Sequence, residues 1–548
     1  MGCLISGGVF LQKIRPLLLV AAVILVGFLL RSLSFQSSPL PYNIDGLSEL
    51  RVSQAILSSH HLDFSALSSE AETYVSDLPV LGLLSAFLSS ALGIEPTTSF
   101  QLLAAFLGAV TVSIFLLIFR QHWPSSSRGA IASALSLALI GSFVFSAGCT
   151  WKETMGFVLV GLALYAFPLR ASLPYRALMT FPLLLSPFTH HLVTVVLLVI
   201  LTFAVIFDFS SKQKNRFLRS FSRNDALDSI TVVGMWSLTA FYYTNIHLPY
   251  LDFLSPRTDL YLYIAVAFLM MMVAVRVSVG RQPITRLPIE LSVPVIGALI
   301  MVYSYYHPLF PGLPGPTSLI AVPFLAYLIL VVPAWDGAGI VLRTRGASKN
   351  LLLAMIFGPL SLILFAFLRS NDATSQLIIY RTFDFLMPAF AILVGLGFAF
   401  LVKDRRKLGI VAGFSLVIIC ASTLPVAYNS QALFGVENQT YWFEYDAVNW
   451  FSEHNVSSYT SDQRLGETGW RLFDLDYGRG LPYDLSENLK LNKSSFYVLE
   501  DQWSTKGAQE FPFGVVKVAQ DTMNTTLLQY DVLYVGGSLN KQITCFST

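Results

Sequence analysis

The residues best suited to chemistry start with an acidic side chain, Asp45, which follows the first long apolar run. It lies in the segment 42–64, YNIDGLSELRVSQAILSSHHLDF, and a second acidic residue, Glu49, comes four positions later. On a helix this spacing places both carboxylates on one face. Two neighbouring carboxylates can share a proton, raise the pKa of one of them to suit a general base, or bind a divalent cation. The plainer alternatives are a helix cap for Asp45 and a solvated helix face for Glu49.

Candidates of the opposite charge come later in the chain. His190 and His191 follow Pro187 at a predicted turn. Neighbouring helical side chains point about 100° apart, so this pair suits one metal ion poorly. Either imidazole can hydrogen-bond an anion or a sugar hydroxyl, although a polar turn at the membrane interface explains them equally well. Lys152 is a candidate phosphate contact, and a local ion pair with Glu153 is its alternative.

Arg381 is more informative, because it lies near the start of the apolar segment 377–400, LIIYRTFDFLMPAFAILVGLGFAF. An arginine inside an apolar helix is costly unless it is paired. Its planar guanidinium suits the oxygens of a phosphate group. An ion pair with Asp384, three residues later, is the structural alternative.

A long series of apolar segments must position these residues. The chain has 548 residues, of which 54% are hydrophobic and only 12% charged, and its mean hydropathy is +0.62. Soluble proteins carry about a quarter charged residues. Apolar runs of membrane-spanning length recur up to about position 425, which predicts a polytopic α-helical membrane protein.

Charge and cysteine content exclude other classes of protein. The net charge of +2 provides no basic surface of the kind that nucleic acid requires. The four cysteines are scattered without metal-ligand spacing, so neither a disulfide framework nor a zinc site is indicated.

Lysine and arginine in short loops predict the orientation of the chain. Lys13 and Arg15 place the N-terminus in the cytoplasm and Asp45 outside. The short segment 78–93 holds Pro79 and is expected to lie at the outer interface rather than to cross. The total comes to about 13 spans with the C-terminus outside. After the first run, spans are expected at 98–119, 129–147, 154–168, twice within 176–207, and at 228–246, 259–278, 289–306, 316–333, 351–368, 379–401 and 408–425.

This topology brings many polar residues to the outer ends of spans. Ionisable side chains gathered at one face indicate a functional site, although loops between spans are polar in any case. The residues concerned are Asp45, Glu49, His60, His61, Asp77, Lys152, Glu153, His190, His191, Arg257, His307, Arg369, Asp372 and Arg381.

From about position 428 the composition changes, and no apolar stretch of spanning length follows. We expect a transmembrane domain over 1–427, with an outer loop at 36–97, and a small extracytoplasmic α+β domain over 428–548. Short strands are predicted at 495–499, 514–519 and 532–535, and a helix at 445–453. The tryptophans of this domain suit its core, or the binding of glycans or proteins.

Sequons for N-glycosylation support the same orientation. All four N-x-S/T sequences of the chain fall in this last domain, and they have meaning only on the non-cytoplasmic side. They start at Asn438, Asn455, Asn492 and Asn524.

As a whole, this order of features resembles the GT-C class of membrane glycosyltransferases, which includes protein O-mannosyltransferases and the aminoarabinose transferase of lipid A. The segment 74–94, YVSDLPVLGLLSAFLSSALGI, is similar to the acidic, PPL and apolar-helix segment of that class, although the second proline is missing. The segment 380–400 is similar to the late helix of archaeal members. The WWDYG-type motif of oligosaccharyltransferase catalytic subunits is absent, so the resemblance does not assign that activity.

The resemblance implies roles for particular residues. Asp45 matches the catalytic base of the class, Arg381 matches its contact to the lipid phosphate, and Asp77 matches its second acidic position. Further substrate contacts are expected from Glu49, Lys152, His190 and His191.

The activity implied is transfer of a sugar, with inversion, from a polyprenyl-phosphate donor to an acceptor hydroxyl of a protein, lipid or glycan at the outer membrane face. The implied location is the plasma membrane, with membrane lipids around the spans and no nucleic-acid partner. No cofactor is identified, and a divalent cation remains compatible with the carboxylates.

Two other classes of function remain open on the sequence alone. A transporter or flippase would place charges near the middle of the bilayer and use repeated, broken helices, and no internal repeat is visible here. A non-catalytic membrane scaffold would use the outer domain to bind partners.

Overall fold

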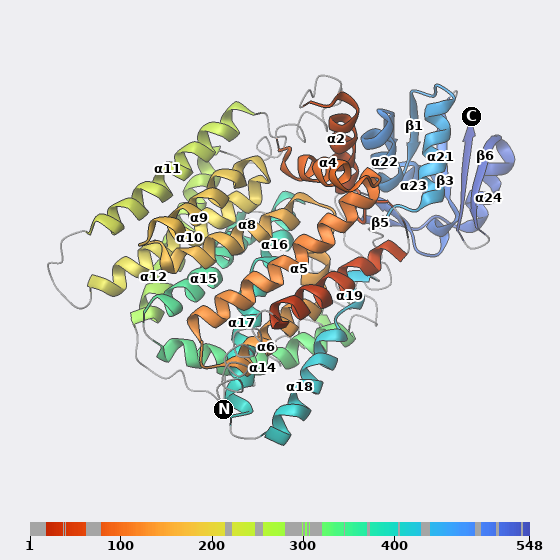
Figure 1. The fold of residues 1–548 in the computed structure, drawn as a ribbon. Helices are drawn as coiled ribbons and strands as arrows, with labels where there is room; N and C mark the ends of the chain where they lie inside the picture. Colours follow the sequence, from red (N-terminus) through yellow and green to blue (C-terminus); the bar gives the residue numbers. More distant parts are fainter. Residues whose placement is uncertain are drawn as a thin grey trace, which may run out of the picture.

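The protein is seen in a computed structural model as a large helical body with a small sheet-containing domain at one end (Figure 1). The structure describes residues 18–36, 38, 40–61, 78–213, 222–246, 256–279, 299, 302–303, 306, 321–344, 346–369, 373–403, 406–428, 439–487, 491, 495–510, 514–538 and 541–547.

Most of the described chain is helical. Nine described helices are long and apolar enough to cross a membrane, beginning with Leu18–Phe35. The chain is therefore an integral membrane protein, as predicted, while the count of about 13 spans stays a prediction. The helices of the body are α5 (Pro96–His122), α6 (Ser127–Leu139), α7 (Gly141–Ser146), α8 (Lys152–Ala166), α9 (Leu173–Leu185), α10 (His191–Gln213), α11 (Arg223–Asn245), α12 (Pro256–Val279), α14 (Ala321–Arg343), α15 (Ala347–Arg369), α16 (Ala373–Asp384), α17 (Met387–Leu401), α18 (Arg406–Ala421) and α19 (Pro425–Tyr428).

Two short helices cover one end of this body. Helix α2 (Asp45–Ser59) follows the first span, and α4 (Val80–Leu92) packs against it. A Cβ atom on Gly82 would lie 2.9 Å from a methyl group of Val52, so glycine permits this close approach. Helix α4 thus lies against α2, and the expectation that this segment does not cross the membrane stays a prediction.

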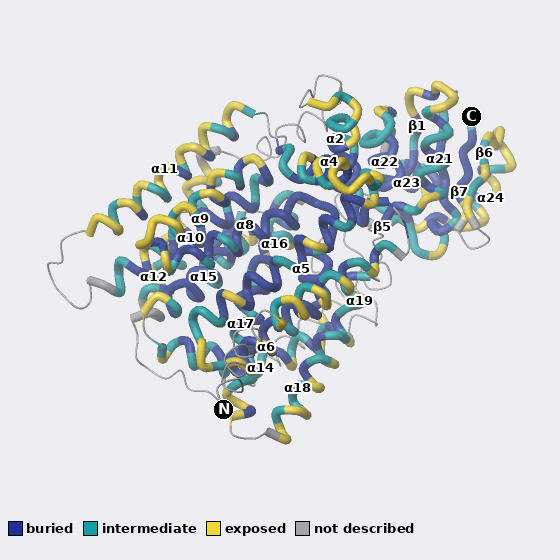
Figure 2. Tube along the Cα trace, viewed as in Figure 1, coloured by how far each residue is buried: buried dark blue, intermediate teal, exposed yellow. Residues whose placement is uncertain are grey.

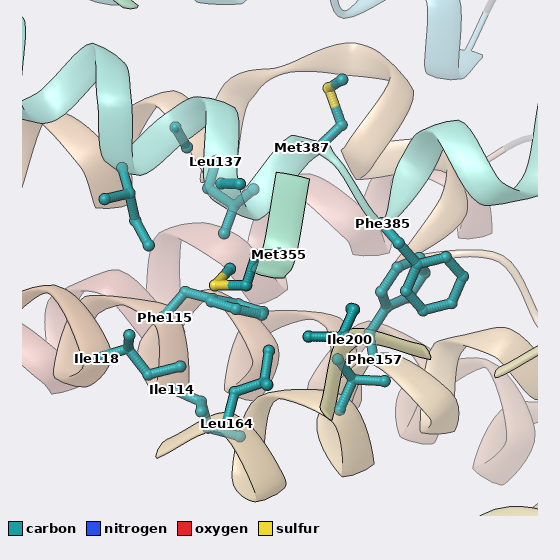
Figure 3. Close-up of a cluster of buried hydrophobic side chains, with 14 of the residues drawn as sticks. Ile114, Phe115, Ile118, Leu137, Phe157, Leu164, Ile200, Met355, Phe385 and Met387 are labelled. Atoms are coloured by element: carbon teal, nitrogen blue, oxygen red, sulfur yellow. The ribbon is translucent and has the colours of Figure 1, made fainter. Parts of the chain in front are cut away.

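Small residues set the packing of the long helices. A Cβ atom on Gly337 of α14 would lie 2.0 Å from the carbonyl oxygen of Leu393 in α17, and one on Gly397 would lie 1.8 Å from that of Pro333. Glycines at both positions let the two helix backbones touch, as is common between membrane helices. Figure 3 shows the apolar side chains that fill the body, among them Phe157 and Phe385 with ring centroids 4.5 Å apart.

The outward faces of several helices are apolar. Ile230 and Phe241 on α11, Phe268 on α12 and Phe414 on α18 are each more than 60% exposed. Figure 2 shows these outer helices as largely exposed or intermediate around a buried centre. Such faces suit contact with lipid tails rather than water.

The domain at the C-terminal end contains a five-stranded mixed sheet of order β2-β1-β3-β7-β6. Strand β1 (Ser458–Ser461) runs parallel to β2 (Asp476–Arg479) and β3 (Phe496–Glu500), and β7 (Lys541–Ser547) is antiparallel to β3 and β6 (Asp531–Ser538). A two-stranded sheet joins β4 (Ala508–Glu510) and β5 (Gly514–Val516). The helices of the domain are α21 (Trp442–Glu453), α22 (Gln463–Phe473), α23 (Leu481–Ser486) and α24 (Gln520–Gln529).

The three predicted strands and the predicted helix of this domain are confirmed as β3, β5, β6 and α21, with shifted ends. Strands β1, β2 and β4 were too short to predict, and β7, whose central residues are buried, was also missed. Trp503 lies in the core, whereas Trp442 is 50% exposed, so the tryptophans do not share one role.

A cluster of buried charged residues holds the helices together at the end of the body away from α2 and α4. The guanidinium of Arg170 lies 2.8 Å from Asp208 and 2.8 Å from Asp228, and Arg176 lies 3.1 Å from Asp228. Asn350 of α15 donates to the second oxygen of Asp208 at 2.8 Å. The cluster therefore links α10, α11 and α15 to the segment around α9, and all of its charges are paired.

Substitution of Asp228 by Asn tests this cluster. The amide keeps the shape of the side chain but leaves Arg170 and Arg176 short of negative charge in a buried setting. We expect a loss of about 3–5 kcal/mol in unfolding free energy, the usual cost of breaking a buried pair. Thermal unfolding in detergent measures it, with Asp521→Asn, at an exposed position in the first turn of α24, as the control. Equal melting temperatures for the two variants would contradict the assignment.

Candidate functional site

The site begins at the first turn of α2. Asn43 accepts a hydrogen bond from the backbone amide of Asp45 through Oδ1 at 2.8 Å, and Asp45 is the first helical residue. The interpretation of Asp45 as the helix cap is therefore wrong, and its carboxylate is available for other contacts. A Cβ atom on Gly46 would lie 2.4 Å from Oγ1 of Thr150. Glycine at this position allows the start of α2 to contact the loop before α8.

The carboxylate of Asp45 lies between two guanidinium groups. Its Oδ2 is 2.9 Å from Nη2 of Arg381, which comes from α16, and its Oδ1 is 3.3 Å from Nη2 of Arg471, which comes from α22. The Asp45 side chain is 34% exposed and that of Arg381 23%. Two residues 336 positions apart in sequence thus meet at one end of the helical body, beside the sheet domain.

The charges around Asp45 set its ionisation. Burial by itself would raise the pKa of this carboxyl group. The positive charges of Arg471 and Arg381 outweigh that effect and hold the pKa of Asp45 below its usual value. The group is therefore a carboxylate at neutral pH.

Arg381 has a second acidic partner, Glu153, which it contacts through Nη1. Oε1 of Glu153 lies 3.2 Å from Nε2 of His190. Nδ1 of His190 accepts from the backbone amide of Leu192 at 3.2 Å, so a neutral ring must carry its proton on Nε2, where it donates to Glu153. The predicted local pair of Lys152 with Glu153 is wrong, because Glu153 pairs with Arg381 and His190.

Lys152 turns instead towards α2. Its Nζ lies 3.1 Å from Oε1 of Glu49, and the exposed fractions of the two side chains are 7% and 1%. The interpretation of Glu49 as a solvated helix face is therefore wrong. Burial raises the pKa of Glu49, although the neighbouring Lys152 acts in the opposite direction.

An aromatic ring supports Arg381 from the helical body. The guanidinium carbon of Arg381 lies 5.3 Å from the ring centre of Trp151, within the range of a cation–π contact. Nε1 of Trp151 donates to the carbonyl of Ser146 at 2.6 Å, which fixes the orientation of the indole. The guanidinium is thus positioned by one ring and two carboxylates.

Arg471 is the residue that the sequence analysis missed. Glu467, one turn earlier on α22, lies 2.8 Å from its Nε, and Tyr477 donates to the other oxygen of Glu467 at 2.9 Å. Nη1 of Arg471 also donates to Ser48 Oγ on α2 at 3.1 Å. An i,i+4 Glu–Arg pair is common on solvated helices, so the spacing carried no signal of a site.

The other predicted residues differ in where they lie. His191 stacks on His190, with ring centroids 4.4 Å apart, behind the contact with Glu153. Asp77 lies outside the described residues. Arg369 pairs with Asp259 of α12 at 2.9 Å. His60 and His61 lie at the exposed end of α2.

Among the described residues, the side chains around Asp45 do not form a ligand set for a divalent cation. Within the described ranges, no group of three or more His, Cys, Asp or Glu side chains is placed to hold a metal ion. Each oxygen of Asp45 faces a guanidinium, and Glu49 faces an ammonium group.

Between Asp45 and Lys152, and again between Lys152 and His190, the chain runs along the helical body and returns to the same end. Asp45, Lys152 and His190 all lie at one end, so α5 and α6, and then α8 and α9, form two out-and-back pairs. This agrees with the predicted course of the chain between 78 and 207.

Comparison with known proteins places the fold. No family model matches the chain, and no curated protein matches it by sequence. The apo oligosaccharyltransferase of Archaeoglobus fulgidus superposes with a TM-score of 0.55 and 13% identity over 90% of this chain and 70% of that one. The AglB oligosaccharyltransferase of the same organism, in complex with an inhibitory peptide and a dolichol-phosphate, gives 0.54 and 13% over the same shares. ArnT of Cupriavidus metallidurans aligns over 96% of this chain and 97% of its own at 11% identity, with a TM-score of 0.38.

These neighbours are GT-C membrane glycosyltransferases, and the predicted GT-C fold is confirmed.

The pair of Lys152 and Glu49 allows a double-mutant test of the site's framework. Lys152→Met should destabilise the protein by about 3–5 kcal/mol, because it leaves Glu49 buried without a counter-charge. Adding Glu49→Gln should recover most of that loss, since neither charge then remains. Thermal unfolding in detergent of the wild type, both single variants and the double variant measures the coupling. Additive losses would show that the two side chains do not interact.

Proposed function

We propose that the chain is a membrane glycosyltransferase that moves a sugar from a polyprenyl-phosphate donor to an acceptor hydroxyl at the outer face of the plasma membrane. The observation that carries this proposal is the convergence of Asp45, Arg381 and Arg471 where the sheet domain meets the helical body. All three side chains are partly accessible, whereas the surrounding pairs are buried. The N-terminus is then cytoplasmic, and residues 428–548 form the extracytoplasmic domain.

Arg381 is suited to the phosphate of the donor. Its guanidinium offers a planar fork of donors at the end of an apolar helix, where the lipid tail can lie among the spans while the phosphate stays at the surface. As the bond between the anomeric carbon and the phosphate oxygen breaks, negative charge grows on the leaving phosphate. A fixed positive charge beside it stabilises that transition state.

Asp45 is suited to take the proton of the acceptor. The acceptor oxygen forms a bond to the anomeric carbon on the side opposite the leaving phosphate, so the configuration is inverted, and its proton passes to the carboxylate. Before the donor binds, Arg381 and Arg471 keep the pKa of Asp45 low and its basicity weak. A phosphate that engages Arg381 removes part of that positive charge. Donor binding therefore raises the basicity of Asp45 when it is needed.

The buried residues of the site are suited to holding Arg381 and helix α2 in position rather than to contacting the substrate. Glu153 and His190 hold Arg381, and the pair of Glu49 and Lys152 joins α2 to α8. Contacts of Glu49, Lys152, His190 and His191 with the substrate would require these pairs to open.

Replacement of Asp45 by Asn tests the proton transfer. The amide keeps the size of the side chain but accepts no proton, so we expect transfer to fall about 10²–10⁴-fold at unchanged protein abundance. Transfer of label from a polyprenyl-phosphate sugar, with Asp521→Asn at an exposed position of the sheet domain as control, measures it. Wild-type rates in the Asp45 variant would remove this residue as the base.

Replacement of Arg381 by Lys tests the phosphate contact. The variant keeps the charge but loses the planar fork, which should weaken donor binding by about 1.5–3 kcal/mol. Separate titrations of donor and acceptor measure the two KM values. A change confined to the acceptor KM would mean that Arg381 does not bind the donor phosphate.

Arg471→Gln should change the pH dependence of the reaction. Arg471 lowers the pKa of Asp45, so its removal raises that pKa, and more of the carboxylate is protonated on the acid side. The acid limb of kcat/KM should therefore move to higher pH in this variant. Arg51→Gln, which removes the neighbouring ion pair with Asp474, is the matched control and should leave the limb in place. Identical limbs in the wild type and the Arg471 variant would contradict the coupling.

A further inference from the structure

The four N-glycosylation sequons of the sheet domain take no part in the proposed reaction. Two of the four, Asn455-Val-Ser and Asn524-Thr-Thr, start at described residues, and those at Asn438 and Asn492 lie outside the described part. Once a domain has folded, a sequon can be used only where its asparagine amide and its hydroxyl can both reach a modifying enzyme. The surroundings of the two described sequons can therefore be compared.

Asn455 is presented on a tight turn at the end of α21. Its φ is 57°, in the left-handed region that asparagine adopts more readily than most residues. The amide of Val456 donates to Phe451 at 3.0 Å and that of Asn455 to Ser452 at 3.3 Å, which closes the helix. Val456 is buried, while Asn455 and Ser457 on either side of it are exposed. The turn therefore holds both reactive side chains outwards.

Asn524 is arranged differently. It lies in the middle of α24, where its Oδ1 accepts from Gln520 at 3.2 Å. The hydroxyl of Thr526 donates to the carbonyl of Thr522 at 2.8 Å, and this side chain is only 8% exposed. An enzyme could engage this sequon only by unwinding the helix.

We propose that Asn455 is a site of N-linked glycosylation in the mature protein, and that Asn524 is not. The co-reactants are a lipid-linked oligosaccharide and an oligosaccharyltransferase of the host. Nδ2 of Asn455 forms a bond to the anomeric carbon, the bond between that carbon and the lipid phosphate breaks, the phosphate leaves with the bonding electrons, and one amide proton passes to a base of the modifying enzyme. The modification requires the domain to be extracytoplasmic, and it does not depend on the activity proposed for the chain itself.

The surface beside Asn455 suits a covalently attached sugar. The ring of His454 stacks on that of Trp450 with centroids 4.2 Å apart, and Tyr534 lies 5.9 Å from the same indole. His454 is exposed. The apolar face of a pyranose ring packs well on such aromatic surfaces. A glycan on Asn455 would therefore cover this stack.

The test uses the full-length chain, expressed in a host with N-glycosylation and carrying one reporter sequon in an appended C-terminal tail. Peptide mapping before and after enzymatic deglycosylation reports occupancy at each asparagine. We expect glycan on Asn455 in the wild type, its complete loss in Ser457→Ala, and no glycan on Asn524. Ser457→Ala keeps asparagine in the left-handed turn, so it removes the sequon without straining the backbone. Asn524→Gln is the matched control and should leave the mass of the chain's glycan unchanged.

Three results would overturn the proposal. One is an unmodified Asn455 in a chain whose reporter sequon is occupied. Another is a glycan that disappears in Asn524→Gln but persists in Ser457→Ala. The third is a chain in which neither the reporter nor Asn455 is modified, because the domain then does not reach the glycosylation compartment.

Discussion

Charges at the edge of an apolar helical body have to be neutralised by partners, and that constraint organises this protein. Arg381 at the start of a membrane helix is balanced by Asp45 and Glu153, and the buried Lys152 is balanced by Glu49. These pairs join α2, α8 and α16, and the contact of Glu153 with His190 brings the start of α10 to the same place. The same rule operates at the far end of the body, where Arg170 and Arg176 are paired with Asp208 and Asp228. Within this framework, Asp45 and Arg381 are the members that remain partly open to the surroundings.

The sheet domain completes the site rather than merely following the spans. Arg471 reaches across from α22 to the carboxylate of Asp45 and to Ser48, and Arg51 of α2 pairs with Asp474 at 2.8 Å. The acidic group is thus shared between the membrane helices and the C-terminal sheet domain. Because both guanidiniums lower its pKa, the position of α22 controls how basic Asp45 is. A substrate that displaced either arginine would change the chemistry of the carboxylate without any large movement of the chain.

Long apolar runs predicted the membrane class, and the resemblance of short segments predicted the GT-C fold; both are confirmed. The sequence also singled out Asp45 and Arg381, which the structure brings into contact, while their roles stay a prediction. The expectation that 78–93 does not cross, from its length and Pro79, stays a prediction. The sequence did not predict which charged residues pair with Asp45, Lys152 and Glu153. Lys152 and Glu153 are neighbours in sequence, and a local pair was the simplest expectation. Both lie in the first turn of α8, where Glu49 of α2 and Arg381 of α16 become their partners. Arg471 left no signal at all, since its spacing from Glu467 matches that of any solvated helix. Which charges meet is decided by tertiary packing, which no local pattern encodes.

The central claim is that this chain breaks the bond between a sugar and a lipid phosphate. The most direct measurement is turnover of a panel of radiolabelled polyprenyl-phosphate sugars by the purified chain in liposomes, with water as the acceptor, followed by separation of free sugar and lipid phosphate. We expect slow release of one sugar with inverted anomeric configuration, and no release by Asp45→Asn. Lipid-linked sugars that stay intact, but move between the leaflets of the liposomes in the presence of the chain, would contradict the claim and identify a transporter.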